Sequence, residues 1–301
     1  MKFCGIICRQ DDESMNVTIK PINAMTVDVE DYFHVSAFEQ HITRDRWDKL
    51  PHRVEQNTGR ILDLFQQRQV KATFFTLGWV GERYPGLVRR IVADGHELAS
   101  HGYQHTRVTE QTPDQFREDL RLSKRILEDV SGQSVIGYRA ASYSIGAKNL
   151  WALEILQEEG FLYSSSIYPV KHDLYGMPDA PRFAYRPTNA PGLLEIPITT
   201  LNLFRRNIPC GGGGFFRLYP YSFSKWAYRY INNKEQQAGI FYFHPWEIDP
   251  EQPKQQGLSF KTRFRHYLNL SKMHDRLDNL ITDFAWDTMR NVFLNKTDCH
   301  H

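Results

Sequence analysis

The sequence contains few cysteines, no long apolar run and no excess of charge of one sign. Four cysteines in 301 residues are too few for the disulfide framework of a small secreted domain, so we expect reduced thiols. No stretch approaches the roughly 18–20 consecutive apolar residues that a membrane-spanning helix needs. Lysine and arginine number 37 and aspartate and glutamate 35, which gives a net charge of +2. Charge alone therefore does not indicate binding to nucleic acid or to an anionic membrane.

The overall amino-acid composition is that of a globular protein. Hydrophobic residues make up 41% and charged residues 24%, which excludes a chain that is disordered throughout. Residues 1–17 lack the basic region and the long apolar stretch that together form a signal peptide. This lack and the scarcity of cysteine favour a cytoplasmic protein without a transmembrane segment.

Seven short β-rich runs alternate with helical segments between about residues 23 and 245. Several of the runs are almost continuously apolar, as expected for parallel strands that are buried on both faces. Such alternation predicts an α/β fold with a parallel sheet, and seven strands favour a barrel smaller than the eight-stranded one. The expected strands are Ala24–Val29, Ala72–Leu77, Glu97–Ser100, Val135–Arg139, Leu162–Ile167, Leu193–Ile198 and Ile240–His244.

Helix signals lie between these runs and after them. The segment from Thr112 to Gln115 combines an N-cap, a proline at the first helical position and a capping-box glutamine. Apolar residues recur at helical spacing after it, and Gly132 follows the expected end. The tail, 260–293, also has apolar residues at helical spacing and is predicted to be helical.

Polar side chains gather at the carboxyl ends of predicted strands, where parallel α/β folds place their sites. Asp28, Glu30 and Asp31 follow the first strand, and carboxylates this close stay ionised only beside a cation or hydrogen-bond donors. His101 and His105 follow the third strand, four residues apart, and can converge on one ion. Two histidines and one carboxylate leave a position for water, as in catalytic zinc sites. Two surface histidines in a loop are the alternative.

Two further strand ends carry single residues of interest. Arg139 could hold a carboxylate by a bidentate pair and lower its pKa, although an ordinary surface ion pair would look the same in sequence. His244 ends an aromatic strand and precedes Pro245, which suits a proton donor near neutral pH. A core histidine with satisfied hydrogen bonds is the competing interpretation.

These four segments, in this order, resemble the polysaccharide deacetylase family with the NodB homology domain, carbohydrate esterase family 4. The most specific matches are His-Gly-Tyr-Gln-His after Gly-His-Glu, and the late Phe-His-Pro. The resemblance covers residues 22–249. The remainder, 250–295, is similar to the extension of a subgroup linked to exosortase and exopolysaccharide loci. The resemblance implies a distorted seven-stranded (β/α) barrel of the NodB type, with a helical C-terminal extension packed on the barrel.

The resemblance also implies an activity, namely metal-dependent hydrolysis of N-acetyl groups on an amino-sugar-containing polysaccharide or its lipid-linked precursor. An N-acetylated glycan is then the expected partner, together with peripheral association with membrane glycan-synthesis machinery and without nucleic acid. A divalent metal is the expected cofactor, with zinc as the first choice, and cobalt, nickel or iron also suit such ligands. The family's roles fall on Asp28 (base), His244 (acid), Arg139 (orienting the base), and His101 and His105 (metal).

The residues expected to bind the substrate match the family less specifically. The backbone around Ser142 matches the family segment that helps to hold the oxyanion. Tyr143 and Trp246 could stack on sugar rings, although most aromatic residues in a chain that is 13% aromatic belong to the core.

Two departures from the family pattern leave alternatives open. The family has adjacent aspartates, whereas here Glu30 fits a spaced variant and Asp31 keeps the usual residue type, so both are candidate metal ligands. The aspartate that usually partners the catalytic histidine would align near Ser164. Serine cannot raise a histidine pKa by its charge, so either Glu247 or Asp249 takes this role or the acid is weaker.

Two rival functions follow from these departures. One is a metal-free cyclic-amide hydrolase of the allantoinase-like branch, against which the presence of both His101 and His105 speaks. The other is a catalytically silent barrel that binds glycan, which the serine at position 164 favours.

Overall fold

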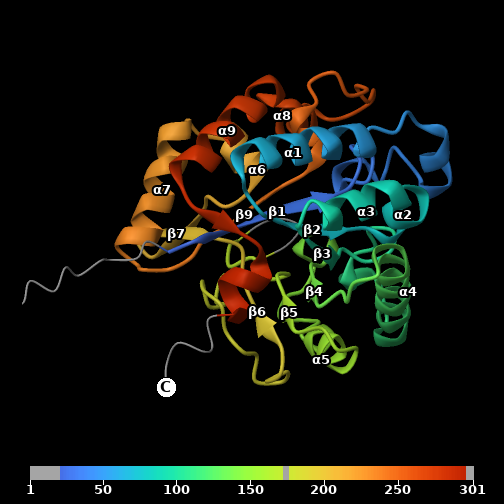
Figure 1. Cartoon of the computed structure of the whole chain (residues 1–301), viewed down its shortest axis with the longest axis horizontal. Helices are drawn as coiled ribbons and strands as arrows, with labels where there is room; N and C mark the ends of the chain where they lie inside the picture. Colours follow the sequence, from blue (N-terminus) through green and yellow to red (C-terminus); the bar gives the residue numbers. More distant parts are fainter. Residues whose placement is uncertain (1–20, 172–175, 296–301) are drawn as a thin grey trace, which may run out of the picture.

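The computed structural model describes residues 21–171 and 176–295, and a parallel sheet lies at the centre of this part of the chain (Figure 1). The neighbouring strands run in the order β9-β1-β2-β3-β4-β5-β6, and every one of these pairs is parallel. This confirms the expected seven-stranded α/β barrel. The strands are β1 (Asn23–Val29), β2 (Thr73–Thr76), β3 (Glu97–Ser100), β4 (Gly137–Tyr138), β5 (Tyr163–Ser164), β6 (Leu194–Glu195) and β9 (Ile240–Phe243).

The barrel is distorted because its two end strands form no ladder in the described ranges. The gap between β6 and β9 is crossed by single contacts, such as the bond from the Ile240 N–H to the Thr199 hydroxyl at 2.5 Å. The carboxyl ends of β2, β3 and β4 are in register, because Thr76 pairs with Ser100 and Ser100 pairs with Tyr138. Residues that follow these strands therefore lie along one rim.

Helices surround the sheet (Figure 1), and the chain also forms helices after the last barrel strand. In the longest helix, α4, the capping box is present, since the Gln115 N–H donates to Thr112 Oγ1 at 3.3 Å and the Thr112 N–H donates to Gln115 Oε1 at 2.9 Å. Gly132 ends it with φ 68°. The helices are α1 (Val54–Arg68), α2 (Gly78–Arg83), α3 (Pro85–Ala93), α4 (Pro113–Ser131), α5 (Trp151–Glu158), α6 (Gly213–Leu218), α7 (Tyr221–Asn233), α8 (Phe260–Tyr267) and α9 (Met273–Asp283).

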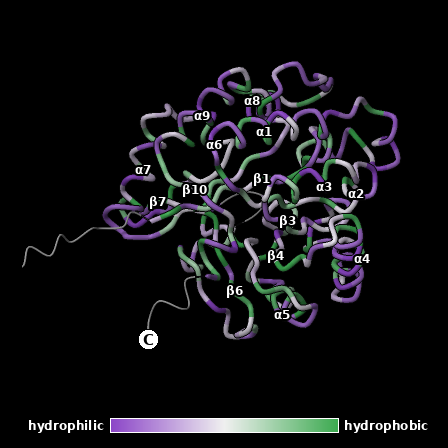
Figure 2. Tube along the Cα trace, in the orientation of Figure 1, coloured by the Kyte–Doolittle hydropathy of each residue, from purple (hydrophilic) through white to green (hydrophobic). Residues whose placement is uncertain are grey.

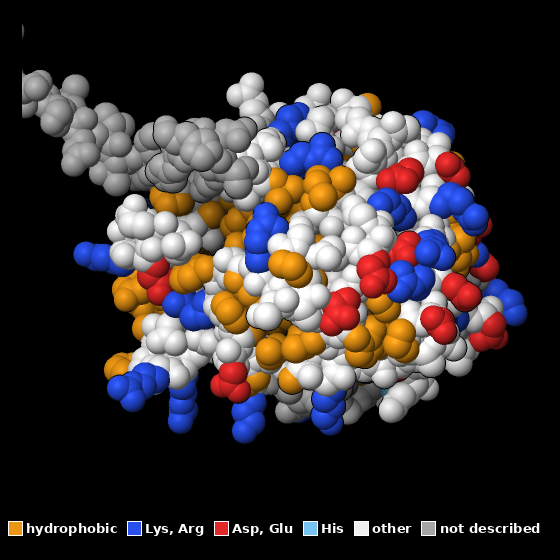
Figure 3. All heavy atoms as spheres, turned by 90° about the horizontal axis from the view of Figure 1, so that it is seen from below, with side chains coloured by type: hydrophobic (Ala, Val, Ile, Leu, Met, Phe, Trp, Pro, Cys, Tyr) orange, Lys and Arg blue, Asp and Glu red, His pale blue; other side chains and the backbone are white. Residues whose placement is uncertain are grey.

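The outer surface is mixed in polarity and in charge. Hydrophilic residues recur along α4 (Figure 2), whose buried face consists of Phe116, Leu120, Ser123 and Leu127. On the face shown in Figure 3, acidic and basic side chains lie close together toward the side that carries α4. None of the helices in the described ranges has both the length and the apolar composition needed to cross a membrane.

The prediction of an entirely helical tail is wrong in part. After α9 the chain forms a strand, β10 (Trp286–Asp287), which pairs in parallel with the start of β1, and then a π-helix, Arg290–Leu294. A strand of two residues is too short to show alternation in sequence, and long-range contacts define it. The Trp286 ring is buried, and its Nε1–H donates to the Leu280 carbonyl at 3.1 Å. An antiparallel hairpin also went unpredicted: β7 (Thr200–Leu203) and β8 (Arg206–Pro209).

The tail packs on the barrel through α9, which buries four apolar side chains in the same core cluster as residues of α1 and β9. Burying a leucine or isoleucine stabilises the fold by about 1.5–3 kcal/mol, so these contacts fix the tail firmly. The division at residues 249 and 250 stays a prediction. The side chains are Met273, Leu277, Leu280 and Ile281.

His266 joins the last turn of α8 to the barrel. Its ring stacks on Trp246 with centroids 4.3 Å apart and rings inclined by 12°, and it also contacts Phe38. Its Nε2 lies 2.7 Å from Gln252 Oε1, as expected for a neutral ring that donates one hydrogen bond. Burial, with the nearby Arg217 charge, lowers the pKa of His266 to about 3.

We therefore expect acid to destabilise the protein less in the variant His266→Gln than in the wild type. The unfolded chain takes up a proton at this position near pH 6.5, whereas the folded chain does so only near pH 3. The contribution of the neutral ring is complete above pH 6.5 and is lost as the pH falls toward 3. Between pH 7 and 5 the difference is about 2 kcal/mol of unfolding free energy. Urea denaturation at both pH values measures it, and an equal loss in both proteins would contradict this prediction.

Candidate active site

The rim formed by the carboxyl ends of β1, β3, β4 and β9 surrounds a cavity of about 200 Å³. Most of the site residues expected from the sequence line it, from segments that are far apart in the chain. The cavity is lined by Asp28, Glu30, Val35, Ser36, His101, His105, Ala140, Ser142, Tyr143, Tyr242 and His244.

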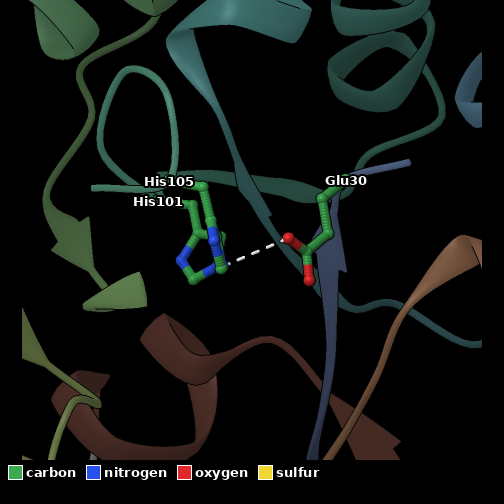
Figure 4. A group of neighbouring side chains, drawn as sticks. All are labelled: Glu30, His101 and His105. Carbon is green, nitrogen blue, oxygen red and sulfur yellow. Dashed lines mark ion pairs between the residues drawn. The ribbon is translucent and has the colours of Figure 1, made fainter. Parts of the chain in front are cut away.

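One side of the cavity holds a group of three buried ligand-type side chains. Glu30 follows β1, and His101 and His105 lie in the segment that follows β3, with ligand atoms all within 4.8 Å of one another. Figure 4 shows both imidazoles beside the Glu30 carboxylate, with the ion pair between His105 Nε2 and Glu30 Oε2 at 3.2 Å. His101 Nδ1 donates to the Arg139 carbonyl at 2.8 Å, which leaves Nε2 with its lone pair for a metal.

The protonation states of this group suit a divalent cation. Burial raises the pKa of Glu30, but the charges of His105 and His244 outweigh it and hold that pKa below its usual value. Burial lowers the pKa of His105 to about 4, so its ring is neutral near pH 7. In the described ranges, Glu30 Oε2 is buried and lacks a hydrogen-bond partner. A buried, ionised carboxylate oxygen that accepts no hydrogen bond, beside two imidazole groups, fits a bound metal ion.

Asp31 does not join the group. Its carboxylate accepts the backbone N–H groups of Tyr32 at 2.8 Å, Arg53 at 2.6 Å and Val54 at 2.9 Å, the last two at the start of α1. The structure therefore brings Glu30 to the histidines and uses Asp31 to hold the amino end of a helix. Side chains two residues apart in an extended chain point to the same side. The spacing therefore indicates that Glu30, rather than Asp31, faces the same side as Asp28.

Asp28 also lines the cavity, and a buried arginine holds its carboxylate. Arg139 Nη1 donates to Asp28 Oδ1 at 2.6 Å and to Thr26 Oγ1 at 2.9 Å. Its other nitrogens donate to Ser165, and its guanidinium lies 4.0 Å from the centroid of the Phe75 ring. Arg139 is 0% exposed, so it does not form an ordinary surface ion pair.

His244 follows the end of β9 and lies among three carboxylates. Its Nε2 is 3.0 Å from Glu30 Oε1 and 4.0 Å from Asp28 Oδ2, and its Nδ1 is 2.8 Å from Glu247 Oε1. Burial opposes its charge, but Glu30 and Glu247 raise the pKa of His244 to about 10. Of the two candidate partners, Glu247 is the one that contacts the ring, whereas Asp249 contacts Asn57 and Arg53.

A residue that the sequence analysis missed completes this network. Arg217 on α6 donates from Nε to Glu247 Oε2 at 2.7 Å. Its Nη1 donates to the carbonyls of His266 at 3.0 Å and Leu268 at 2.6 Å. No sequence pattern marks Arg217, because its partners lie 30 to 51 residues further along the chain.

The three expected substrate-binding residues differ in their surroundings. Ser142, with φ 53°, and Tyr143 both line the cavity, and Ser142 Oγ lies 2.6 Å from Ser36 Oγ. Trp246 is sandwiched between the rings of His244, at 5.2 Å, and His266, at 4.3 Å. Both of its faces are covered, so the expectation that a sugar ring stacks on Trp246 is not supported.

Comparisons with known proteins agree with this geometry. Residues 44–162 match the family model described as polysaccharide deacetylase, and residues 165–294 match a domain of unknown function, DUF3473. The chain therefore contains a polysaccharide deacetylase domain, which is followed by the DUF3473 region. That second match begins within the barrel and includes His244, Glu247 and Arg217.

Individual relatives are similar over shorter stretches. A peptidoglycan-N-acetylglucosamine deacetylase of Bacillus cereus is 37% identical over 75 residues, which are 25% of this chain and 27% of that protein. A chitooligosaccharide deacetylase of a Bradyrhizobium species is 30% identical over 95 residues, 32% of this chain and 43% of that protein. A crystal structure from Mycobacterium smegmatis, described as a candidate polysaccharide deacetylase, superposes with a TM-score of 0.57 at 20% identity. It covers 90% of this chain and 89% of its own, which shows the shared fold.

Proposed function

We propose that this protein is a metal-dependent hydrolase that removes N-acetyl groups from an amino-sugar-containing polysaccharide or its lipid-linked precursor and releases acetate. The observation that carries the proposal is the convergence of Glu30, His101 and His105 on one side of a cavity that also holds Asp28 and His244. The similarity to the B. cereus peptidoglycan-N-acetylglucosamine deacetylase and the Bradyrhizobium chitooligosaccharide deacetylase supports it. A cytoplasmic location and contact with membrane glycan-synthesis machinery stay predictions from the sequence.

Glu30, His101 and His105 would hold the metal, and zinc is the first choice because two imidazoles and a carboxylate are its usual catalytic ligands. A divalent cation supplies Lewis-acid activation of the acetyl carbonyl and of water. The same donors also accept cobalt, nickel or iron.

The chain's own residues then provide the proton transfers. Asp28, oriented by Arg139, accepts a proton from the water that attacks the acetyl carbon. Ser142 lines the cavity, and a backbone N–H there would stabilise the transition state, in which the carbonyl oxygen gains negative charge. His244, protonated and held by Glu247, donates a proton to the departing nitrogen as the C–N bond breaks. Water and the acetamide thus become acetate and a free amine.

The structure weakens the grounds for both rival functions. The silent glycan-binding barrel was favoured by the serine at position 164, but Glu247 contacts His244 in place of the family's aspartate. A metal-free cyclic-amide hydrolase has no use for Glu30, His101 and His105 around one point.

We expect the purified protein to release acetate from N-acetylated oligosaccharides and to lose at least nine-tenths of this activity with a chelator. Adding zinc back should restore it. The assay uses chitooligosaccharides and peptidoglycan fragments as parallel substrates, with acetate measured enzymatically. Release of acetate that is insensitive to the chelator would contradict the metal requirement. The absence of acetate from every substrate in the presence of zinc would contradict the proposed activity.

A further inference from the structure

The hairpin formed by β7 and β8 ends in a turn whose backbone does not suit its sequence. Leu203 pairs with Arg206, so Phe204 and Arg205 are the two central residues of the turn, and both have positive φ, 51° and 61°. Turns with this backbone usually contain asparagine and glycine, because a bulky side chain is strained there. Packing does not compensate for the strain, since Phe204 is 97% exposed. Strain that the fold does not need is typical of a segment that binds something.

Helix α7 lies beside this hairpin (Figure 1) and adds further exposed aromatic rings. Leu201 of the hairpin belongs to the same small apolar cluster as Ala227 and Ile231 of α7. On the outside of the helix, Trp226 is 45% exposed and Tyr230 is 36% exposed, and their ring centroids are 6.1 Å apart. Exposed aromatic residues therefore gather in this part of the molecule, and such gatherings mark interaction surfaces.

The overall charge of +2 conceals a strongly basic segment here. Between Glu195 and Glu235 the chain contains no aspartate or glutamate. Figure 3 shows lysine and arginine side chains projecting beside hydrophobic ones toward the side that carries α7. A partner of this surface should therefore carry negative charge. The basic residues of the segment are Arg205, Arg206, Arg217, Lys225, Arg229 and Lys234.

The two arginines of the hairpin turn are the ones that are open to a partner. Arg205 and Arg206 are both exposed, and neither forms an ion pair with another described residue. By contrast, Lys225 Nζ lies 2.6 Å from Asp283 Oδ1. Two unpaired guanidinium groups thus lie directly beside an exposed phenyl ring at the tip of the hairpin.

We propose that this surface rests on an anionic lipid bilayer, with Phe204 inserted at the level of the headgroups. The name hairpin face is used for it and covers Phe204, Arg205, Arg206, Trp226 and Tyr230. Tryptophan and tyrosine favour the membrane–water interface, and anionic headgroups attract arginine. A bilayer offers both apolar depth and negative charge at every point, whereas an acidic protein would need a pocket at the matching place. The proposal does not depend on the proposed function.

Co-sedimentation with vesicles tests the charge requirement. In about 100 mM salt, the wild type should bind phosphatidylcholine vesicles with about 30% phosphatidylglycerol about tenfold more tightly than phosphatidylcholine alone. The variant Arg205→Gln/Arg206→Gln should reduce this preference to about twofold. Arg89→Gln/Arg125→Gln is the matched control, because it removes two exposed arginines from α3 and α4. The control should keep the full preference.

A second variant separates binding from folding. Phe204→Asn/Arg205→Gly gives the turn the residues that its backbone favours, so it should melt a few degrees higher than the wild type. It should nevertheless bind the anionic vesicles about tenfold more weakly. On binding, the tryptophan emission of the wild type should shift to shorter wavelength, and Trp226→Phe should remove most of this shift.

Four results would overturn the proposal. They are equal binding of the wild type to both kinds of vesicle, a double arginine variant that keeps the preference, a turn variant that binds like the wild type, and an emission shift that Trp226→Phe leaves intact. Soluble polyglutamate that binds as tightly as the anionic vesicles would identify an acidic polypeptide as the partner and would overturn it as well. None of the substituted residues lines the active-site cavity, so acetate release from chitotetraose reports on the proposed function separately.

Discussion

The variant His101→Ala should bind no stoichiometric zinc and should release acetate about 10³-fold more slowly than the wild type. Alanine removes one of the three proposed ligands and leaves Glu30 and His105, which cannot hold a divalent ion tightly by themselves. Loss of the Lewis acid removes several kcal/mol of transition-state stabilisation, and about 4 kcal/mol corresponds to a factor of about 10³ in rate. Metal analysis of protein purified without chelator and acetate release with added zinc measure the two effects.

The control for this variant is another buried histidine near the same strand. His96 accepts the Ala72 N–H on Nδ1 at 3.2 Å and does not line the cavity. His96→Gln should therefore keep one zinc per chain, whatever it costs in stability. A His101→Ala protein that is folded and still holds one zinc would show that the three-ligand site is wrong.

The strands and the positions of the polar residues were accessible from the sequence because their signals are local. Apolar runs predicted all seven strands of the barrel, and parallel strands bring their carboxyl ends to one rim. The spacing of His101 and His105 and their place after β3 could be read in the same way. The ladder in β4, β5 and β6 has only two residues per strand, so the predicted bounds were too wide there.

The choice between Glu30 and Asp31 needed the fold. Asp31 is engaged by the N–H groups of Arg53 and Val54, which lie 22 and 23 residues away at the start of α1. The sequence also could not decide which carboxylate contacts His244, because no local pattern distinguishes Glu247 from Asp249. Contacts between distant segments decide such questions, and one sequence contains no record of them.

The second part of the chain contributes to the site and is more than a cover for the barrel. Backbone carbonyls of residues 265–268 hold Arg217, Arg217 holds Glu247, and Glu247 contacts the ring of His244. The DUF3473 match includes every member of this chain of contacts. The structure thus connects this region to the proposed proton donor.

The variant Asp28→Asn should lower acetate release by about 10³-fold or more while zinc binding is kept. The asparagine retains an oxygen that can accept from Arg139 Nη1, but it cannot take a proton from water. The substitution also leaves a fully buried guanidinium without its ion-pair partner. Removing one partner of a buried pair costs about 3–5 kcal/mol, and the remaining hydrogen bond should reduce this to about 2–4 kcal/mol of unfolding free energy.

A second substitution separates the loss of stability from the loss of activity. Because Arg139→Met removes the unpaired charge, the double variant Asp28→Asn/Arg139→Met should recover part of the unfolding free energy in urea denaturation. It should recover none of the acetate release, since the proton acceptor is still missing. A double variant that regained activity along with stability would mean that Asp28 acts through folding alone. The base would then have to be another group in the cavity.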